Sequence, residues 1–162
     1  MRLMTFGMMI AAALSGGVLA HEVTLGDIQI IHPHIAAPFA GAKSAAAYMV
    51  IANEGDQADR LIGVETPAAK MPGLHATDHG ADGIARMQPR ASVDVPAGDT
   101  VVLEPGGLHI MLMGLTAPLT IGQMVPGVLI FERAGRIEVE FSVDPADGVD
   151  HSTMDHTTAG QD

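Results

Sequence analysis

Apolar and polar residues alternate along the chain in short runs, and the clearest run lies at residues 136–143. Apolar side chains occupy every second position from Ile137 to Val143, and charged or hydroxyl side chains fill the positions between them. Successive side chains of a strand point to opposite faces, so this pattern predicts a β-strand with one buried face and one solvated face. Residues 132–135 end in Gly135 and predict a hairpin loop before this strand.

Seven further runs of this kind predict strands that are separated by residues typical of turns. They are Val23–Ile31, Ala45–Asn53, Arg60–Thr66, Ile84–Gln88, Thr100–Glu104, Leu108–Leu112 and Gly127–Phe131. After residue 20 no segment keeps the 3.6-residue period of an amphipathic helix. Several short strands at regular spacing predict an all-β fold, an antiparallel β-sandwich or barrel in a single domain. The glycine-bearing segment Ala69–Arg86 is predicted to be a long loop that delivers His75.

The two ends of the chain differ from this β pattern. Residues 1–20 combine Arg2, an apolar stretch and the small-residue sequence Val18-Leu19-Ala20, which together predict a cleaved export signal. The apolar stretch is shorter than the roughly 18 residues that a spanning helix needs, so we expect no membrane insertion after cleavage. Residues 21–144 form the predicted folded domain, and residues 145–162 a flexible tail without apolar periodicity.

Charge and cysteine content narrow the range of functions. Cleavage after Ala20 removes Arg2 and leaves 7 basic against 19 acidic residues, a formal charge of −12. This charge argues against nucleic acid as a partner, because the phosphates repel it. The chain contains no cysteine, which excludes disulfide bonds and blue-copper sites that need a thiolate. Any sulfur ligand for a metal therefore comes from methionine.

Two histidines and two methionines form the strongest chemical pattern in the chain. His109 and Met111 lie two residues apart in a predicted strand, so their side chains share one face. His75 and Met87 precede them, with eleven residues between these two and twenty-one between Met87 and His109. Thioether sulfur is a poor ligand for zinc, magnesium or calcium but a good one for Cu(I), and imidazole accepts copper. The four residues predict a Cu(I) site.

The other methionines and histidines of the β region receive simpler interpretations. Met49, Met113 and Met124 are predicted to fill gaps in the core, as methionine in an apolar strand commonly does. His79 is predicted to be a solvated loop residue.

The spacing of the four proposed ligands resembles the signature of the periplasmic copper chaperone family PCu(A)C. The segment Pro105–Leu115 is the most specific match, and the resemblance runs from about residue 21 to about residue 143. It implies a cupredoxin-like Greek-key fold and a periplasmic carrier of Cu(I) that is not an enzyme. It also implies a copper-accepting partner, such as a cytochrome oxidase subunit or another copper chaperone. One departure is His34, which follows His32-Pro33 where we expect the family to have tryptophan.

Histidines at the two ends of the mature chain leave alternatives open. Cleavage after Ala20 makes His21 the mature N-terminus, whose amine and imidazole together chelate Cu(II), as in a cupric carrier or a copper oxygenase. In the tail, His151, Met154 and His156 lie within six residues and predict a candidate second site, for Cu(II). A third alternative is a structural module that binds no metal.

Overall fold

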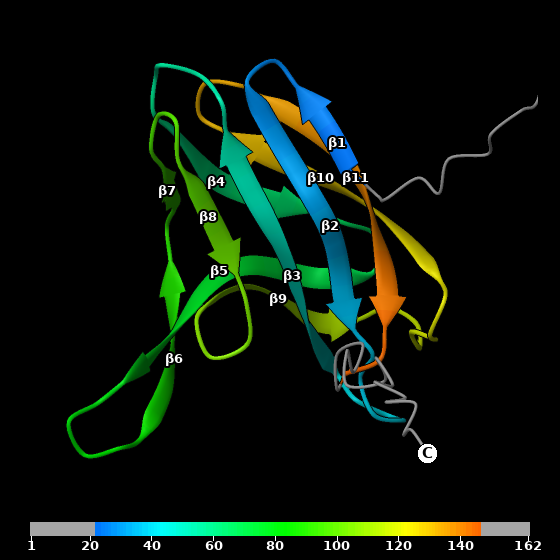
Figure 1. Cartoon of the computed structure of the whole chain (residues 1–162). Coiled ribbons are helices and arrows are strands. Elements are labelled where there is room, and N and C mark those ends of the chain that lie inside the picture. Colours follow the sequence, from blue (N-terminus) through cyan, green and yellow to red (C-terminus); the bar gives the residue numbers. More distant parts are fainter. Residues whose placement is uncertain (1–21, 147–162) are drawn as a thin grey trace, which may run out of the picture.

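The computed structural model describes residues 22–146, which form eleven β-strands in a single domain (Figure 1). The strands are β1 (Glu22–Leu25), β2 (Ile28–Ala36), β3 (Ser44–Asn53), β4 (Asp59–Glu65), β5 (Ala69–His79), β6 (Ala85–Arg90), β7 (Val93–Val95), β8 (Thr100–Leu103), β9 (Leu108–Leu115), β10 (Met124–Phe131) and β11 (Arg136–Asp144). Within the same residues, no helix has the length and hydropathy that crossing a lipid bilayer requires.

The strands belong to one sheet that curls into a nearly closed barrel (Figure 1). Their order is β6-β5-β9-β8-β3-β2-β11-β10-β4-β7, with β1 beside β2 and an additional pairing of β9 with β3. The predicted all-β single domain is confirmed, but two pairs, β2 with β11 and β8 with β9, are parallel. The alternation of apolar residues determines which face of a strand is buried, and it leaves the direction of its neighbour open. An all-antiparallel sheet was therefore an incomplete prediction.

Residues 69–79 correct the sequence prediction most clearly, because they form strand β5 and not a loop. β5 lies between β6 and β9, and it pairs with both along most of its length. Only Leu74 and Ala76 mark its buried face in the half that carries His75, so the apolar signal is weak while Gly73 and Gly80 resemble loop residues. Pairing on both sides stabilises this strand in spite of its composition.

The core lies between the two walls of the curled sheet. β3 shows how the sequence builds it, because every second side chain from Ala45 to Ile51 is at most 7% exposed. The side chains between them, including Tyr48, point to the outer face. Met49 is 2% exposed and confirms its predicted core position. Phe141 of β11 is a fully buried aromatic residue of this core.

A β-bulge in β2 changes which residues face outward. The pairing of β2 with β3 shifts by one residue between Ile31 and His34, so one strand carries an extra residue there. Before the shift the core-facing residues are Ile28 and Ile30, and after it Pro33 and Ile35. His32 within the bulge has a φ of 47°, the left-handed region that a non-glycine residue rarely adopts. Both His32 and His34 consequently lie on the outer face of the barrel.

The buried carboxylate of Asp59 holds the loop between β10 and β11. Its Oδ1 accepts the backbone N–H groups of Arg60 (2.7 Å) and Arg133 (2.9 Å), and its Oδ2 accepts that of Ala134 (2.9 Å). The residue is 6% exposed. One side chain therefore satisfies backbone donors from two segments that lie far apart in the sequence.

Replacing Asp59 by alanine is expected to lower the free energy of unfolding by about 3 kcal/mol, because three partly buried N–H groups lose a charged acceptor. Urea denaturation followed by far-UV circular dichroism measures the change. The matched control is Asp56→Ala on the exposed turn before β4, which is expected to change stability by less than about 0.5 kcal/mol. Equal midpoints for the two variants would contradict this role of Asp59.

Candidate metal centre

Three neighbouring strands, β6, β5 and β9, carry the four residues of the predicted copper site. His75 of β5 pairs directly with His109 of β9, and Met111 pairs with Gly73 two residues before His75. On the other side of β5, Met87 of β6 pairs with Thr77, two residues after His75. Paired residues share a face of the sheet, and so do residues two apart on a strand. The register thus brings all four side chains to the same outer face.

The two histidines of this group stack on each other. Their ring centroids lie 5.9 Å apart and the ring planes differ by 23°. His109 is 4% exposed, while His75 is half-buried. The Nδ1–H group of His109 donates to the carbonyl of Gly107 at 3.1 Å, and Nδ1 of His75 faces the carbonyl of Gly73 at a longer 3.5 Å. Since a carbonyl only accepts, these contacts orient each ring with its Nε2 lone pair free.

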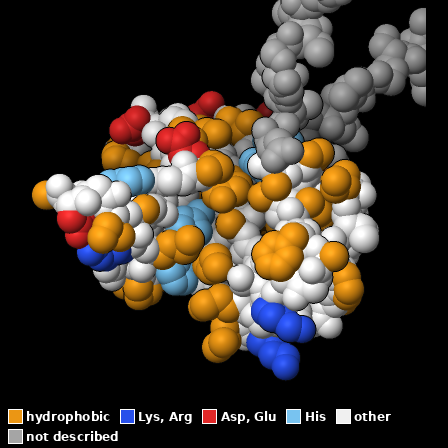
Figure 2. All heavy atoms as spheres, turned by 90° about the horizontal axis from the view of Figure 1, so that it is seen from below, with side chains coloured by type: hydrophobic (Ala, Val, Ile, Leu, Met, Phe, Trp, Pro, Cys, Tyr) orange, Lys and Arg blue, Asp and Glu red, His pale blue; other side chains and the backbone are white. Residues whose placement is uncertain are grey.

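The free Nε2 atom of His109 fits a metal ligand. It is buried and has no hydrogen-bond partner within residues 22–146. Buried polar atoms of folded proteins nearly always have a hydrogen-bond partner. A buried imidazole nitrogen without one, next to a second imidazole, therefore indicates that the nitrogen binds a ligand. A soft cation fits this role, because the nearby donors are a second nitrogen and thioether sulfur. Figure 2 shows imidazoles set among hydrophobic side chains on the lower side of the molecule.

The two predicted methionine ligands differ in exposure. Met111 is partly buried beside β3, where it pairs with Ala46. Met87 is 61% exposed on β6, the outer strand of the hairpin that projects from the barrel (Figure 1). The structure therefore places three of the residues, His75, His109 and Met111, close to the body of the barrel. Met87 lies on β6, on the other side of β5 from β9, where it is accessible to solvent.

Tyr48 of β3 lies beside the histidine pair. Its ring centroid is 6.5 Å from that of His109 and 5.6 Å from that of His34, with which it pairs across β2 and β3. Burial raises the pKa of the Tyr48 phenol above its ordinary value of 10.0, so the phenol stays uncharged at neutral pH. His34, which replaces the expected tryptophan, is thus one side chain away from a predicted ligand.

Comparisons with known proteins identify relatives of this domain. The family model described as "Putative lipoprotein LpqE-like" matches residues 28–143. Among solved structures, the copper-bound PCuAC domain from PmoF2 matches with a TM-score of 0.67 and 30% identity, over 77% of this chain and 98% of that one. This chain belongs to the PCu(A)C copper chaperone family. The fold class predicted from the sequence is that of its PCu(A)C relatives.

Two further relatives of this PCu(A)C protein are similar over different lengths. The Cu(I) form of DR1885 from Deinococcus radiodurans has a TM-score of 0.57 and 31% identity, over 82% of this chain and 85% of that one. The "Putative lipoprotein Lxx21020" of Leifsonia xyli subsp. xyli is 38% identical over 94 residues. That match spans 57% of this chain and about half, 55%, of the relative. The word lipoprotein describes exported, envelope-associated proteins.

Two methionines that the sequence analysis did not assign to the site also lie on the ligand face of the PCu(A)C domain, the outer face of β5, β6 and β9 that carries the four predicted ligands. Met71 of β5 pairs with Met113 of β9, next to the pair of Gly73 and Met111. Met71 is 60% exposed, and Met113 is only partly buried. The prediction of Met113 as a core residue is therefore wrong. Its place two residues after Met111 in one strand was the signal, since alternation puts it on the ligand face.

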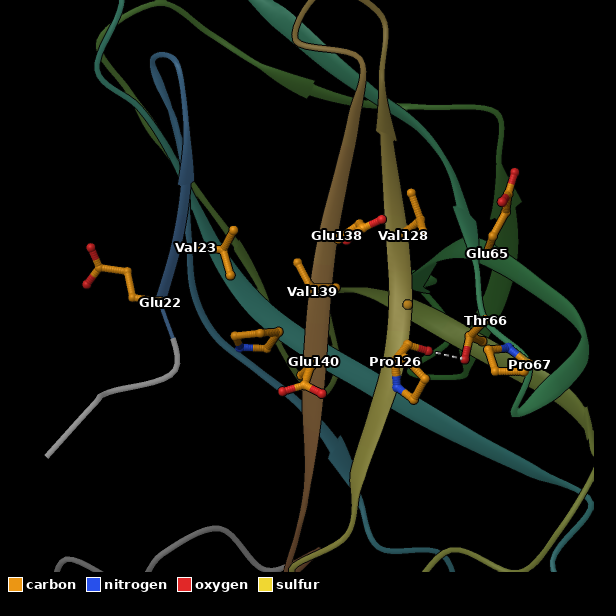
Figure 3. A pocket seen from close by; sticks show the side chains of 12 residues that line it. Glu22, Val23, Glu65, Thr66, Pro67, Pro126, Val128, Glu138, Val139 and Glu140 are labelled. Atoms are coloured by element: carbon orange, nitrogen blue, oxygen red, sulfur yellow. Dashed lines mark hydrogen bonds between the residues drawn. The ribbon is translucent and has the colours of Figure 1, made fainter.

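A pocket of about 830 Å³ lies on another part of the barrel, lined by residues of β1, β2, β4, β10, β11 and the turn after β4 (Figure 3). Its lining combines carboxylates, such as Glu138 and Glu140, with apolar side chains, such as Val139. The Thr66 hydroxyl donates to the carbonyl of Pro126 at 2.8 Å and joins the turn to β10. No histidine or methionine is among its described lining residues, so this pocket offers no soft ligand for copper.

Three parts of the sequence prediction lie outside residues 22–146. They are the export signal at residues 1–20, the cupric chelate at His21, and the tail site of His151, Met154 and His156. They stay predictions.

Proposed function

We propose that this protein binds one Cu(I) ion through His75, Met87, His109 and Met111 and carries it to an accepting protein. The observation that carries the proposal is the buried Nε2 atom of His109, which has no hydrogen-bond partner among residues 22–146. The copper-bound PmoF2 domain and the Cu(I) form of DR1885 support the choice of metal. The predicted export signal supports a location outside the cytoplasm, in the periplasm.

The chemistry of the ligands suits a carrier and not an enzyme. Two imidazoles and two thioethers are neutral donors, so a bound Cu(I) ion keeps its positive charge. Negatively charged thiolate ligands bind Cu(I) more tightly than these neutral donors do. Copper therefore moves from this protein to an accepting protein that has thiolate ligands. The exposed side chain of Met87 supports this direction of transfer, because an acceptor reaches the ion from that side.

Two recipients fit this chemistry. One is a copper-binding subunit of a respiratory cytochrome oxidase, and the other is a second copper chaperone. The formal charge of −11 for the whole chain favours a recipient with a basic or neutral docking surface, since like charges slow the encounter of two proteins.

The His109→Asn variant tests the site. Asparagine keeps an N–H donor near the position of Nδ1, where it still reaches the carbonyl of Gly107, but it removes Nε2. Cu(I) affinity, measured anaerobically by competition with a calibrated chelator, is expected to fall by more than the roughly 10–100-fold that loss of a supporting residue costs. The matched control is His79→Asn at the exposed end of β5, which is expected to leave the affinity unchanged.

Three outcomes of this titration decide the proposal. Loss of Cu(I) in His109→Asn with retention in His79→Asn supports it. Equal affinities in both variants and in the parent would contradict it and assign the copper to other residues. No Cu(I) binding by the parent would contradict it too, and would favour the structural module that binds no metal. Far-UV circular dichroism of each variant separates loss of a ligand from loss of the fold.

Transfer is tested separately by mixing the Cu(I)-loaded protein with the soluble copper domain of an oxidase subunit. After separation by size, copper is expected in the oxidase domain and no longer in the carrier. Copper that stays with the carrier at equimolar concentrations would reject this recipient and leave a second chaperone as the candidate to test next.

A further inference from the structure

A second group of side chains that can serve as metal ligands lies where β2 and β11 run side by side (Figure 1). It consists of His32 and His34 of β2 and Asp144 at the end of β11. One ligand atom from each of the three lies within 4.8 Å of the other two. Donors around an ion with bonds of about 2.0–2.2 Å lie about 3–4 Å apart, so small side-chain rotations are enough to enclose one ion. None of the three residues belongs to the Cu(I) site.

The backbone is shaped to bring these residues together. The bulge of β2 turns both histidines to the outer face, and it does so with His32 at a φ of 47°. Among residues 22–146, His32 is the one non-glycine residue with a positive φ. Strained backbone of this kind is commonly found at functional sites. The parallel pairing of β11 with β2 then places Asp144 at the same end, where its carbonyl accepts the N–H of Ala37 at 2.8 Å.

Within the group, His34 has a free ligand atom, while His32 and Asp144 contact each other through theirs. The Nδ1–H group of His34 donates to the carbonyl of His32 at 3.1 Å, so its Nε2 lone pair is unprotonated and available. Nε2 of His32 lies 3.1 Å from a carboxylate oxygen of Asp144. Ser142 pairs with His34 across the two strands, and its buried hydroxyl has no hydrogen-bond partner in the described chain. A metal-bound water is a natural partner for that hydroxyl.

We propose that His32, His34 and Asp144 form a second metal site, which binds Cu(II). Two nitrogens and one carboxylate oxygen, without sulfur, favour a divalent ion over Cu(I). Among the divalent first-row ions such a site binds copper most tightly, following the Irving–Williams order. The carboxylate of Asp144 neutralises part of the charge of Cu(II), whereas a site with only neutral donors neutralises none of it. This inference uses other residues and another oxidation state than the Cu(I) site, so it does not depend on that proposal.

The two sites are neighbours on one face of the sheet. From β2 to β5 a row of rings runs from His34 through Tyr48 and His109 to His75, with successive centroids 5.6, 6.5 and 5.9 Å apart. Tyr48 is therefore the single ring between the sites. It is also the only tyrosine of a chain without tryptophan. Its fluorescence is thus a local probe, because a paramagnetic Cu(II) ion quenches a fluorophore so close to it.

The experiment titrates the metal-free mature protein with Cu(II) while Tyr48 fluorescence is recorded. One equivalent is expected to quench the emission in the parent. The His32→Asn and His34→Asn variants are expected to need at least about tenfold more Cu(II), since each loses one nitrogen ligand. Asparagine suits both positions, because it tolerates a positive φ at residue 32 and keeps the Nδ1-like donor at residue 34. Asp144→Asn, which loses the charge alone, is expected to weaken binding as well.

The control variant is His109→Asn, which removes a Cu(I) ligand on the other side of Tyr48 and is expected to quench as the parent does. Quenching that His109→Asn abolishes would assign Cu(II) to the first site and overturn the inference. The reciprocal readout is Cu(I) affinity, which His34→Asn is expected to leave unchanged. A loss of Cu(I) affinity in that variant would mean a single composite site, and would also overturn it.

Cu(II) sites at His21 and in the tail are excluded by substitution in the full chain. A variant that carries His21→Ala, His151→Ala and His156→Ala is expected to keep the quenching, and its loss would assign the ion to the termini instead. Substitution is preferable to truncation at Val143, which also deletes Asp144. Zn(II) at equal concentration is expected to leave Cu(II) bound, and displacement by Zn(II) would overturn the assignment to copper.

Discussion

The Met111→Leu variant is expected to lose tight Cu(I) binding while it keeps its fold. Leucine has nearly the volume and apolarity of methionine, so the free energy of unfolding should change by less than about 1.5 kcal/mol. Leucine has no lone pair, however, and the ion keeps two imidazoles and the exposed sulfur of Met87. Cu(I) affinity should therefore fall by more than the roughly 10–100-fold typical of a supporting residue, as measured by anaerobic chelator competition.

The chain offers a close control for this experiment. Met113 lies two residues further along β9 on the same face, and it pairs with Met71 and Ser44 rather than with residues of the proposed site. Met113→Leu makes the same chemical change. It is expected to keep the Cu(I) affinity within about twofold of the parent, the variation that a substitution outside the site causes. If both variants lose copper equally, the sulfur ligand is shared among several methionines and the four-residue assignment is wrong.

The largest expected effect on stability comes from Phe141→Ala. The Phe141 ring is 1% exposed and packs over Gly127 of β10 so closely that a Cβ atom there would lie 2.6 Å from its Cε2 atom. Removing the ring leaves a cavity in the centre of the core and is expected to cost about 3–5 kcal/mol. Because domains of this kind are stable by only about 5–15 kcal/mol, the urea midpoint should fall strongly.

Phe39→Ala is the matched control, because this ring is 80% exposed in the loop after β2. The same deletion there should change stability by less than about 0.5 kcal/mol. A small effect of Phe141→Ala, similar to that of Phe39→Ala, would mean that the core repacks around the vacancy. β11 carries Phe141 and, three residues later, Asp144, so unfolding of this strand should also release Cu(II) from the second site.

The face that a side chain takes within one strand was predictable from the sequence, because it depends on local spacing. His109 and Met111 share a face in any extended strand, and the register of β9 agrees with that expectation. The alternation from Ile137 to Val143 likewise determines which side of β11 enters the core. The shared face of His109 and Met111 and several predicted strands therefore rest on a two-residue period that needs no knowledge of neighbouring strands.

The strand that the sequence analysis missed depends on pairing between segments that are distant in the sequence. Residues 69–79 became a strand because β6 and β9 supply hydrogen bonds on both sides, and no local pattern contains that information. Only this pairing brings His75 opposite His109, which lies on another strand of the sheet. Met113 is a different case, because its place two residues after Met111 already put it on the same face of β9, and its apolar character alone suggested the core.

The second metal site is the strongest case of a feature that only the tertiary structure decided. His32 and His34 lie near the start of the domain and Asp144 at its end, with no spacing that links them. A one-residue bulge and one parallel pairing bring them within 4.8 Å. By itself the sequence predicted an export signal and an all-β chain with two imidazoles and two thioethers at the spacing of a copper site. Which strands are neighbours, and hence which histidines meet, follows from long-range packing that alternation does not encode.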